Sequence, residues 1–207
     1  MSRILVLGTH NRKKLGELAG LLASQHLVLK TLADFPAAIA VEETGDSFAE
    51  NARLKATMQA RCLGQWVLGE DSGLSVDALG GAPGVQSARY SGPEATDEKN
   101  NARLLAALGD LPLPQRTAHY TCYAVLSDPA GQVRAESEGI CRGRIRFAPS
   151  GSGGFGYDPL FEVVEYHQTF GELAPAVKAV LSHRSRAIRQ LVPQIATLIA
   201  SGAWPAG

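Results

Sequence analysis

The chain has 207 residues, of which 20 are lysine or arginine and 20 are aspartate or glutamate, so its formal net charge is zero. This length predicts a single domain with a buried core, and the charge balance argues against a nucleic-acid polymer as partner. Three widely spaced cysteines form neither a metal-ligand motif nor a disulfide framework, which indicates a reducing cytoplasm. No apolar run approaches membrane-spanning length.

The first predicted strand covers residues 3–8, whose apolar run is too short for a signal peptide. The polar segment 9–14, THNRKK, follows it and leads into a helix with one leucine-rich face. Asn11 is the expected N-cap. Free backbone N–H groups, the helix dipole and the cations Arg12, Lys13 and Lys14 would then favour one anion, such as a phosphate. The alternative is a solvated basic first turn.

The next predicted strand covers residues 27–32 and precedes an acidic loop that contains Glu42 and Glu43. Ser47 and Glu50 form a capping-box pattern at the start of a helix expected to end near Gly64. The two glutamates either serve solubility, or one of them meets an acidic residue of the following segment around a divalent cation.

The most informative segment is 69–92, GEDSGLSVDALGGAPGVQSARYSG. An apolar run at residues 66–68 breaks here into Glu70-Asp71-Ser72-Gly73, which predicts that a buried strand ends at a polar site. Acidic residues, a glycine-rich loop and Arg89 suggest a site for a metal ion and phosphate. The alternative is a simple turn in which Asp71 and its neighbours cap backbone groups.

The rest of the chain alternates predicted elements. A helix is expected from Thr96 through residue 108, two strands at 116–127 and 132–145 joined by a turn, and a strand at 160–164. The glycine-rich segment 150–159 carries two aromatic residues that either contact a planar base or belong to the core.

The last predicted helical region, residues 175–201, breaks at Ser182. Lys178, His183 and Arg184 lie near this break. They either bind a base edge or phosphate, or are surface cations.

Together these segments resemble the inosine triphosphate pyrophosphatase family of the RdgB/HAM1 type, which acts on non-standard purine nucleoside triphosphates. The resemblance runs from Leu5 to about Leu191 and rests on five motifs in order: THNRKK, EETGDSFAENARLKA, DSGLSVDALGGAPGVQSARYSG, SGSGGFGYDPLF and KAVLSHRSRA. Glu70 stands where the family commonly has aspartate.

The resemblance implies roles for particular residues. Asp71 is expected to be the catalytic proton acceptor and a metal ligand, together with Glu43 or Glu42, of which Glu43 is favoured. The expected substrate-binding residues are Thr9, His10, Asn11, Arg12, Lys13, Lys14, Ser72, Phe155, Gly156, Tyr157, Asp158, Lys178, His183 and Arg184.

The resemblance also implies an α/β fold over residues 1–207, with a long central mixed sheet flanked by helices and two lobes around an active-site cleft. The expected activity is hydrolysis of ITP, dITP and XTP to the monophosphate and pyrophosphate, by a cytoplasmic homodimer that requires at least one Mg²⁺ per subunit. Such an enzyme removes deaminated purines from the nucleotide pool. Rival hypotheses are a nucleotide sensor without turnover, an enzyme acting on modified pyrimidine triphosphates, and a dimeric interaction module.

Overall fold

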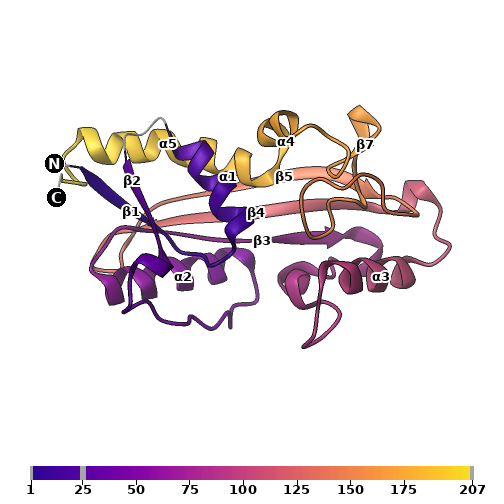
Figure 1. Ribbon diagram of the computed structural model, residues 1–207, viewed down its shortest axis with the longest axis horizontal. Helices are drawn as coiled ribbons and strands as arrows, with labels where there is room; N and C mark the ends of the chain where they lie inside the picture. The colour runs from indigo at the N-terminus through magenta and orange to yellow at the C-terminus, as the bar shows by residue number, and fades with distance from the viewer. Residues whose placement is uncertain (1, 24–26, 206–207) are drawn as a thin grey trace. The chain divides into compact units, whose positions relative to one another are not determined.

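The computed structural model of the protein describes residues 2–23 and 27–205 (Figure 1). Within this part of the chain the α-helices are α1 (Arg12–Leu22), α2 (Phe48–Leu63), α3 (Asp97–Leu108), α4 (Pro175–Leu181) and α5 (His183–Ala200). The strands are β1 (Arg3–Leu7), β2 (Leu27–Thr31), β3 (Val67–Val76), β4 (Thr117–Ser127), β5 (Val133–Ile145), β6 (Phe161–Val163) and β7 (Gln168–Thr169).

The strands form one mixed sheet in the order β2-β1-β3-β4-β5-β6-β7. β1 pairs in parallel with both β2 and β3, whereas β6 pairs antiparallel with both β5 and β7. The α/β fold with a central mixed sheet and flanking helices, predicted from the sequence, is therefore confirmed.

The chain divides into two compact units, which are described separately. The first comprises the residues up to Asp71, Cys122–Gly139, and the residues from Arg184 onward. The second comprises Ser72–Thr121 and Ile140–His183. Since β3, β4 and β5 run through both sets of residues, each of these strands contributes to both units.

In the first unit, helices cover both faces of the sheet, with α1 and α5 on one face and α2 on the other (Figure 1). Successive strand side chains point to opposite faces. Leu7 and Leu68 accordingly pack with α1 and α5, whereas Val6 and Val67 pack with Ala60 of α2. This alternation decides which helix each polar residue of β3 meets.

Gly69 allows α2 to approach β3 closely. A Cβ atom at this position would lie 2.6 Å from the carbonyl oxygen of Ala52 and 2.6 Å from the backbone nitrogen of Ala56. Only glycine leaves room for this contact between the two backbones.

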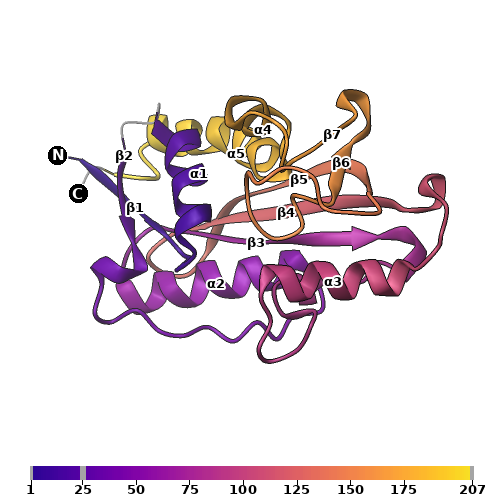
Figure 2. The ribbon, with the colours of Figure 1, turned by 45° about the vertical axis from the view of Figure 1, so that its right-hand side comes forward.

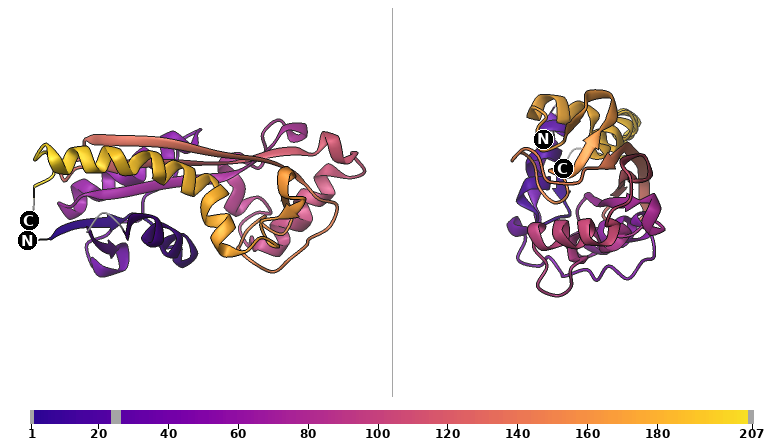
Figure 3. Two further views of the ribbon diagram at one scale, coloured as in Figure 1. Left: turned by 90° about the horizontal axis from the view of Figure 1, so that it is seen from above. Right: turned by 90° about the vertical axis from the view of Figure 1, so that its right-hand side faces the viewer.

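Both ends of the described chain are anchored to the first unit. Arg3 Nε donates a hydrogen bond of 2.8 Å to the carbonyl oxygen of Trp204. The Trp204 ring stacks on Trp66 with a centroid separation of 4.3 Å. The start of β1 and the segment after α5 therefore lie side by side (Figure 3).

The second unit has an aromatic core. The Tyr120 ring lies 4.7 Å from that of Phe161, which in turn lies 5.2 Å from that of Phe170. Helix α3 adds Leu104 and Leu108 to this core. Strands β6 and β7 extend the sheet beyond β5 (Figure 2).

The predicted helix starts are confirmed by their caps. The side-chain oxygens of Asn11, Ser47 and Thr96 each accept a backbone N–H of the first helical turn. The capping box at Ser47 takes a variant form, because the Glu50 carboxylate accepts the N–H of Asp46, the residue before the cap. Helix α2 ends at a left-handed glycine and α5 begins directly after Ser182, both as predicted.

The predicted end of the strand before Glu70 is wrong. β3 continues to Val76, so Glu70, Asp71 and Ser72 lie inside a strand and not in a turn after it. Both carboxylates are buried in the sheet and receive cationic partners there. Paired carboxylates can remain within a buried strand, because the pairing offsets the cost of removing them from water.

Candidate active site

The junction between β1 and α1 holds the predicted phosphate-binding segment. Asn11 Oδ1 accepts the backbone N–H groups of Lys13 and Lys14 at 3.0 and 3.2 Å, and Thr9 Oγ1 accepts the N–H of Asn11 at 3.1 Å. The expectation that these first-turn N–H groups are free for an anion is therefore wrong, because the cap already binds two of them. The donors left in this segment are chiefly side chains.

Lys14 is directed at Glu70 of β3. Its Nζ lies 2.6 Å from Glu70 Oε1, and only 17% of its side chain is exposed. Arg184, at the start of α5, approaches the same carboxylate with Nε at 3.2 Å from Oε2, and it also pairs with Glu17 of α1. Cys122 Sγ lies 3.1 Å from Glu70 Oε2. Glu70 thus joins β3 to α1, α5 and β4.

Asp71 lies on the opposite face of β3, toward α2. Lys55 of α2 places its Nζ 2.8 Å from Asp71 Oδ1 and 3.0 Å from Glu43 Oε1. The lysine thereby gathers two carboxylates that are far apart in the sequence. Asp71 Oδ2 is buried and has no hydrogen-bond partner among the described residues.

The two neighbouring carboxylates of β3 have opposite electrostatic environments. Burial raises the pKa of Asp71, and the nearby Lys55 offsets this only in part. Burial also opposes the charged form of Glu70, but Arg184 and Lys14 outweigh it and hold the pKa of Glu70 well below its usual range. A carboxylate with a raised pKa is the better proton acceptor, so Asp71 is suited to act as a base and Glu70 to remain a fixed charge.

The loop that carries Glu43 is tied to the N-terminal part of α2. Asn51 is fully buried and accepts the backbone N–H of Gly45 at 2.8 Å. A Cβ on Gly45 would lie 2.6 Å from Glu50 Cβ, so the loop contacts the helix without an intervening side chain. Since Asn51 and Lys55 are four residues apart, they share one face of the helix. This face fixes the position of Glu43.

The donor set of Glu43 and Asp71 fits a magnesium ion. Mg²⁺ is usually held by one or two carboxylates, with water and phosphate oxygens completing its shell. Asp71 contributes a buried oxygen without a protein partner among the described residues, and Glu43 stands across Lys55 from it. No group of three or more His, Cys, Asp and Glu side chains is placed to share a metal within residues 2–23 and 27–205.

A second group of predicted site residues lies in the second unit. Lys178 Nζ lies 2.7 Å from Asp158 Oδ2 and 5.0 Å from the centre of the Phe155 ring. Asp158 also accepts the backbone N–H of Phe155 at 2.8 Å. Gly154 must be glycine, because its φ is 76° and a Cβ there would collide with the Asp158 carboxylate. Lys178, Asp158 and Phe155 therefore form one ordered cluster.

The two other aromatic side chains of this group belong to the core. Tyr157 is buried, and its hydroxyl donates to the carbonyl oxygen of Ser87 at 2.8 Å. The His183 ring stacks on Tyr120 with centroids 4.6 Å apart. For Tyr157 the structure thus favours the core alternative over direct contact with a base, whereas Phe155 is only half-buried.

The remaining predicted residues differ in exposure. Glu42 is exposed, whereas Glu43 is half-buried beside Lys55, so Glu43 is the better placed of the two to share a cation with Asp71. His10 and Lys13 are exposed, Ser72 is half-buried next to Asp71, and the side chain of Arg12 lies outside the described residues. The sequence analysis assigned no role to Lys55, although this residue lies in the ENARLKA motif. Its spacing of four residues from Asn51 places both side chains on one face of the helix, and this could have indicated that Lys55 belongs to the site.

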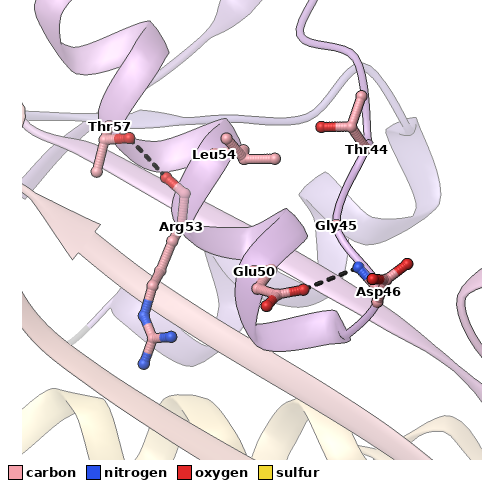
Figure 4. Close-up of a pocket in the computed structure, with 7 residues that line it drawn as sticks. All are labelled: Thr44, Gly45, Asp46, Glu50, Arg53, Leu54 and Thr57. Atoms are coloured by element: carbon pink, nitrogen blue, oxygen red, sulfur yellow. Dashed lines mark hydrogen bonds between the residues drawn. The ribbon is translucent and has the colours of Figure 1, made fainter.

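A pocket of about 480 Å³ opens at the N-terminal end of α2 (Figure 4). It is lined by Thr44, Gly45, Asp46, Glu50, Arg53, Leu54 and Thr57. It borders the loop that follows Glu43 but contains neither Asp71 nor Lys14. Its arginine, Arg53, is engaged by Glu136 at 2.9 Å. The pocket is therefore not the predicted chemical site.

Comparison with known proteins assigns the chain to a family. The chain is 54% identical to a dITP/XTP pyrophosphatase of Rhodopirellula baltica over 98% of its own length and 97% of that protein. It is 45% identical to a dITP/XTP pyrophosphatase of a Nostoc species, covering 98% and 100% of the two chains. The structure of a HAM1 protein from Coxiella burnetii superposes with a TM-score of 0.86 at 36% identity, covering 96% of this chain and 99% of that one. Residues 5–194 match the Ham1 family, and the chain therefore belongs to it.

Proposed function

We propose that this protein hydrolyses the purine nucleoside triphosphates ITP, dITP and XTP to the monophosphate and pyrophosphate, and so removes deaminated purines from the nucleotide pool. The observation that carries the proposal is the buried Asp71, paired on one oxygen with Lys55 and unpartnered on the other among the described residues. The names of relatives that match almost the whole chain support the choice of substrate.

Phosphate binding requires cations, because a nucleoside triphosphate carries about four negative charges. Lys14 and Lys55 supply two ammonium groups in the first unit, and both already face carboxylates. Each lysine is therefore ordered before the substrate arrives, which lowers the entropic cost of binding.

Asp71 is the proposed general base. Lys55 engages Oδ1 and no described residue engages Oδ2, so with Mg²⁺ bound one oxygen of Asp71 would hold the ion and the other would accept the proton of the attacking water. Burial raises the pKa of Asp71, which makes its carboxylate a stronger base.

Glu43 and Asp71 are the proposed Mg²⁺ ligands. A bound Mg²⁺ would neutralise phosphate charge and lower the pKa of a bound water. Glu42 is the alternative to Glu43, and its exposure makes it the weaker candidate.

Base recognition is assigned to the cluster in the second unit. Lys178 is held by Asp158 beside the Phe155 ring, so a donor and an aromatic surface lie together. A 6-oxo purine presents an acceptor to such a donor, whereas the 6-amino group of adenine does not. His183 was expected to add a donor, but its ring stacks on Tyr120, and Arg184 pairs with Glu70 and Glu17, so Lys178 is the donor on which the proposal rests.

The decisive experiment is a panel of ITP, dITP, XTP, GTP, ATP and dUTP with released pyrophosphate measured in the presence of Mg²⁺. We expect pyrophosphate from ITP, dITP and XTP at rates well above those for ATP and GTP. Binding of ITP without pyrophosphate release would instead indicate a sensor, and preference for dUTP would indicate a pyrimidine enzyme.

We further propose that the protein acts in the cytoplasm as a homodimer, without a nucleic-acid polymer as partner. Within the described residues no helix is long and apolar enough to cross a membrane. The three cysteines form no disulfide within the described residues. Sedimentation at micromolar concentration tests the oligomeric state.

A further inference from the structure

Glu70 is a buried carboxylate to which the proposed reaction assigns no role. Its side chain is 1% exposed, and it accepts from Lys14, Arg184 and Cys122. A buried carboxylate is costly unless all its oxygens are partnered. These donors satisfy Glu70, so its place in β3 is compatible with a permanent negative charge.

The two cations around Glu70 differ in accessibility. The side chain of Arg184 is 2% exposed and that of Lys14 is 17% exposed. Arg184, on α5, donates hydrogen bonds to both Glu70 and Glu17. Because it is buried and held by two carboxylates, it fixes the position of the Glu70 carboxylate. Lys14 approaches from the start of α1, where the sequence predicts the phosphate site. Glu70 therefore bridges the buried Arg184 and the more accessible Lys14, which lies at the predicted phosphate site.

Lys14 can contact a phosphate only through its terminal ammonium group, so the position of that group decides what the residue contributes. Lysine has a flexible four-carbon side chain, and an unpaired Lys14 would sample many rotamers. The contact of 2.6 Å with Glu70 Oε1 selects one of them.

We propose that Glu70 is a positioning residue for the phosphate site, which acts through Lys14 and does not touch the substrate. This inference rests on the proposed function and deepens it. The positive charge of Arg184 balances the negative charge of Glu70, so the three side chains together still carry the positive charge of Lys14. Glu70 can therefore hold Lys14 in place without cancelling the charge that attracts phosphate.

The proposal predicts a split between substrate binding and turnover. Glu70→Gln removes a negative charge near the ligand, so KM for ITP should stay the same or fall. The loss of alignment should reduce kcat by about 10-fold or more, because a displacement of order 1 Å in a catalytic site can cost about 100-fold. A purely structural role would not lower kcat while leaving KM unchanged or lower.

The test is a double-mutant cycle of Glu70→Gln and Lys14→Ala, with kcat and KM for ITP measured for all four proteins. We expect Glu70→Gln to cause no more than about a 2-fold further loss of kcat once Lys14 is absent, because residues that act as a unit are not additive. An equal loss in both backgrounds, or a kcat for Glu70→Gln within about 2-fold of wild type, would overturn the proposal.

Glu162→Gln is the matched control. Glu162 is equally buried and holds Arg144 at 2.7 Å; both belong to the second unit, whereas Lys14 belongs to the first. This variant should lose thermal stability like Glu70→Gln but keep a normal kcat. If Glu70→Gln does not fold, Glu70→Asn also removes the negative charge and carries the same cycle.

A second readout does not depend on catalysis. The rate at which an amine-reactive reagent acylates Lys14, followed by mass spectrometry, should rise in Glu70→Gln or Glu70→Asn and stay unchanged in Glu162→Gln. An unchanged rate in both Glu70 variants would overturn the proposal. If the wild type does not release pyrophosphate from ITP, the proposed function fails. The role of Glu70 is then still decided by the acylation rate of Lys14 and by comparing the affinity for pyrophosphate of the wild type and Lys14→Ala.

Discussion

Replacement of Asp71 by asparagine should separate catalysis from stability. Asn keeps the shape of the side chain and one carbonyl oxygen near Lys55, but it cannot accept a proton from water. Loss of a general base costs about 10²- to 10⁴-fold in rate, which corresponds to about 3 to 5 kcal/mol of transition-state stabilisation. The assay is pyrophosphate release from ITP at saturating Mg²⁺.

The same substitution should not lower the melting temperature at neutral pH. The folded state raises the pKa of Asp71, so the charged form is less favourable in the folded chain than in the unfolded one. This contribution destabilises the protein above the folded pKa and disappears as pH falls through it. A neutral asparagine removes it, and Lys55 retains Glu43 as a partner.

Asp128→Asn provides the control of opposite sign. Asp128 is buried in the turn between β4 and β5, where Oδ1 accepts the backbone N–H groups of Ala130 and Gln132, while Oδ2 pairs with Arg134. This variant should melt earlier and keep its turnover. Near-normal kcat in Asp71→Asn, or a melting temperature that falls as far as in Asp128→Asn, would refute the assignment of Asp71 as the base.

Four further predictions follow from other contacts. Glu43→Gln should raise the Mg²⁺ concentration needed for half-maximal activity and Glu42→Gln should not; the reverse order would make Glu42 the ligand. kcat/KM for ITP and XTP should exceed that for ATP by about 10- to 100-fold, since an unpaired buried donor costs about 1–3 kcal/mol, and equal values would contradict base reading by Lys178 and its neighbours. Gly69→Ala should lower the free energy of unfolding by about 1–3 kcal/mol, because the new Cβ pushes α2 away from β3. Gly16→Ala, in open space on α1, should raise the free energy of unfolding by about 0.5–1 kcal/mol. Denaturant unfolding measures both. Arg144 holds the pKa of Glu162 below its usual range. The pair therefore stabilises the fold at pH above the unfolded pKa of about 4.3, and this stabilisation is lost as pH falls through the folded pKa. Glu162→Gln should accordingly weaken the dependence of the unfolding free energy on pH in the acid range.

The sequence predicted most of the local structure, because caps and apolar periodicity act over a few residues. The N-caps Asn11, Ser47 and Thr96 are where the patterns placed them. The course of β3 through Glu70 and Asp71 could not be predicted in this way. Charged residues normally interrupt a buried strand, and what lets them stay are partners that only the fold supplies.

The candidate site shows the same limit. Arg184 meets Glu70 across 114 positions of sequence, and Lys55 reaches Asp71 from the facing helix. The motifs predicted a shared role for Asp71 and Glu43 but gave no reason for their proximity. That reason is Lys55, whose pKa Asp71 and Glu43 raise against the opposing effect of burial.

The alternation of β3 has a consequence for insertions and deletions. Glu70 faces the side of α1 and α5, and Asp71 faces α2. A shift of one residue in a strand moves every side chain to the other face. Removal of a single residue between Val67 and Glu70 would turn Asp71 away from Lys55 and toward Lys14 and Arg184. The same change would turn Glu70 toward α2. This stretch should therefore accept substitutions far more readily than any change in its length.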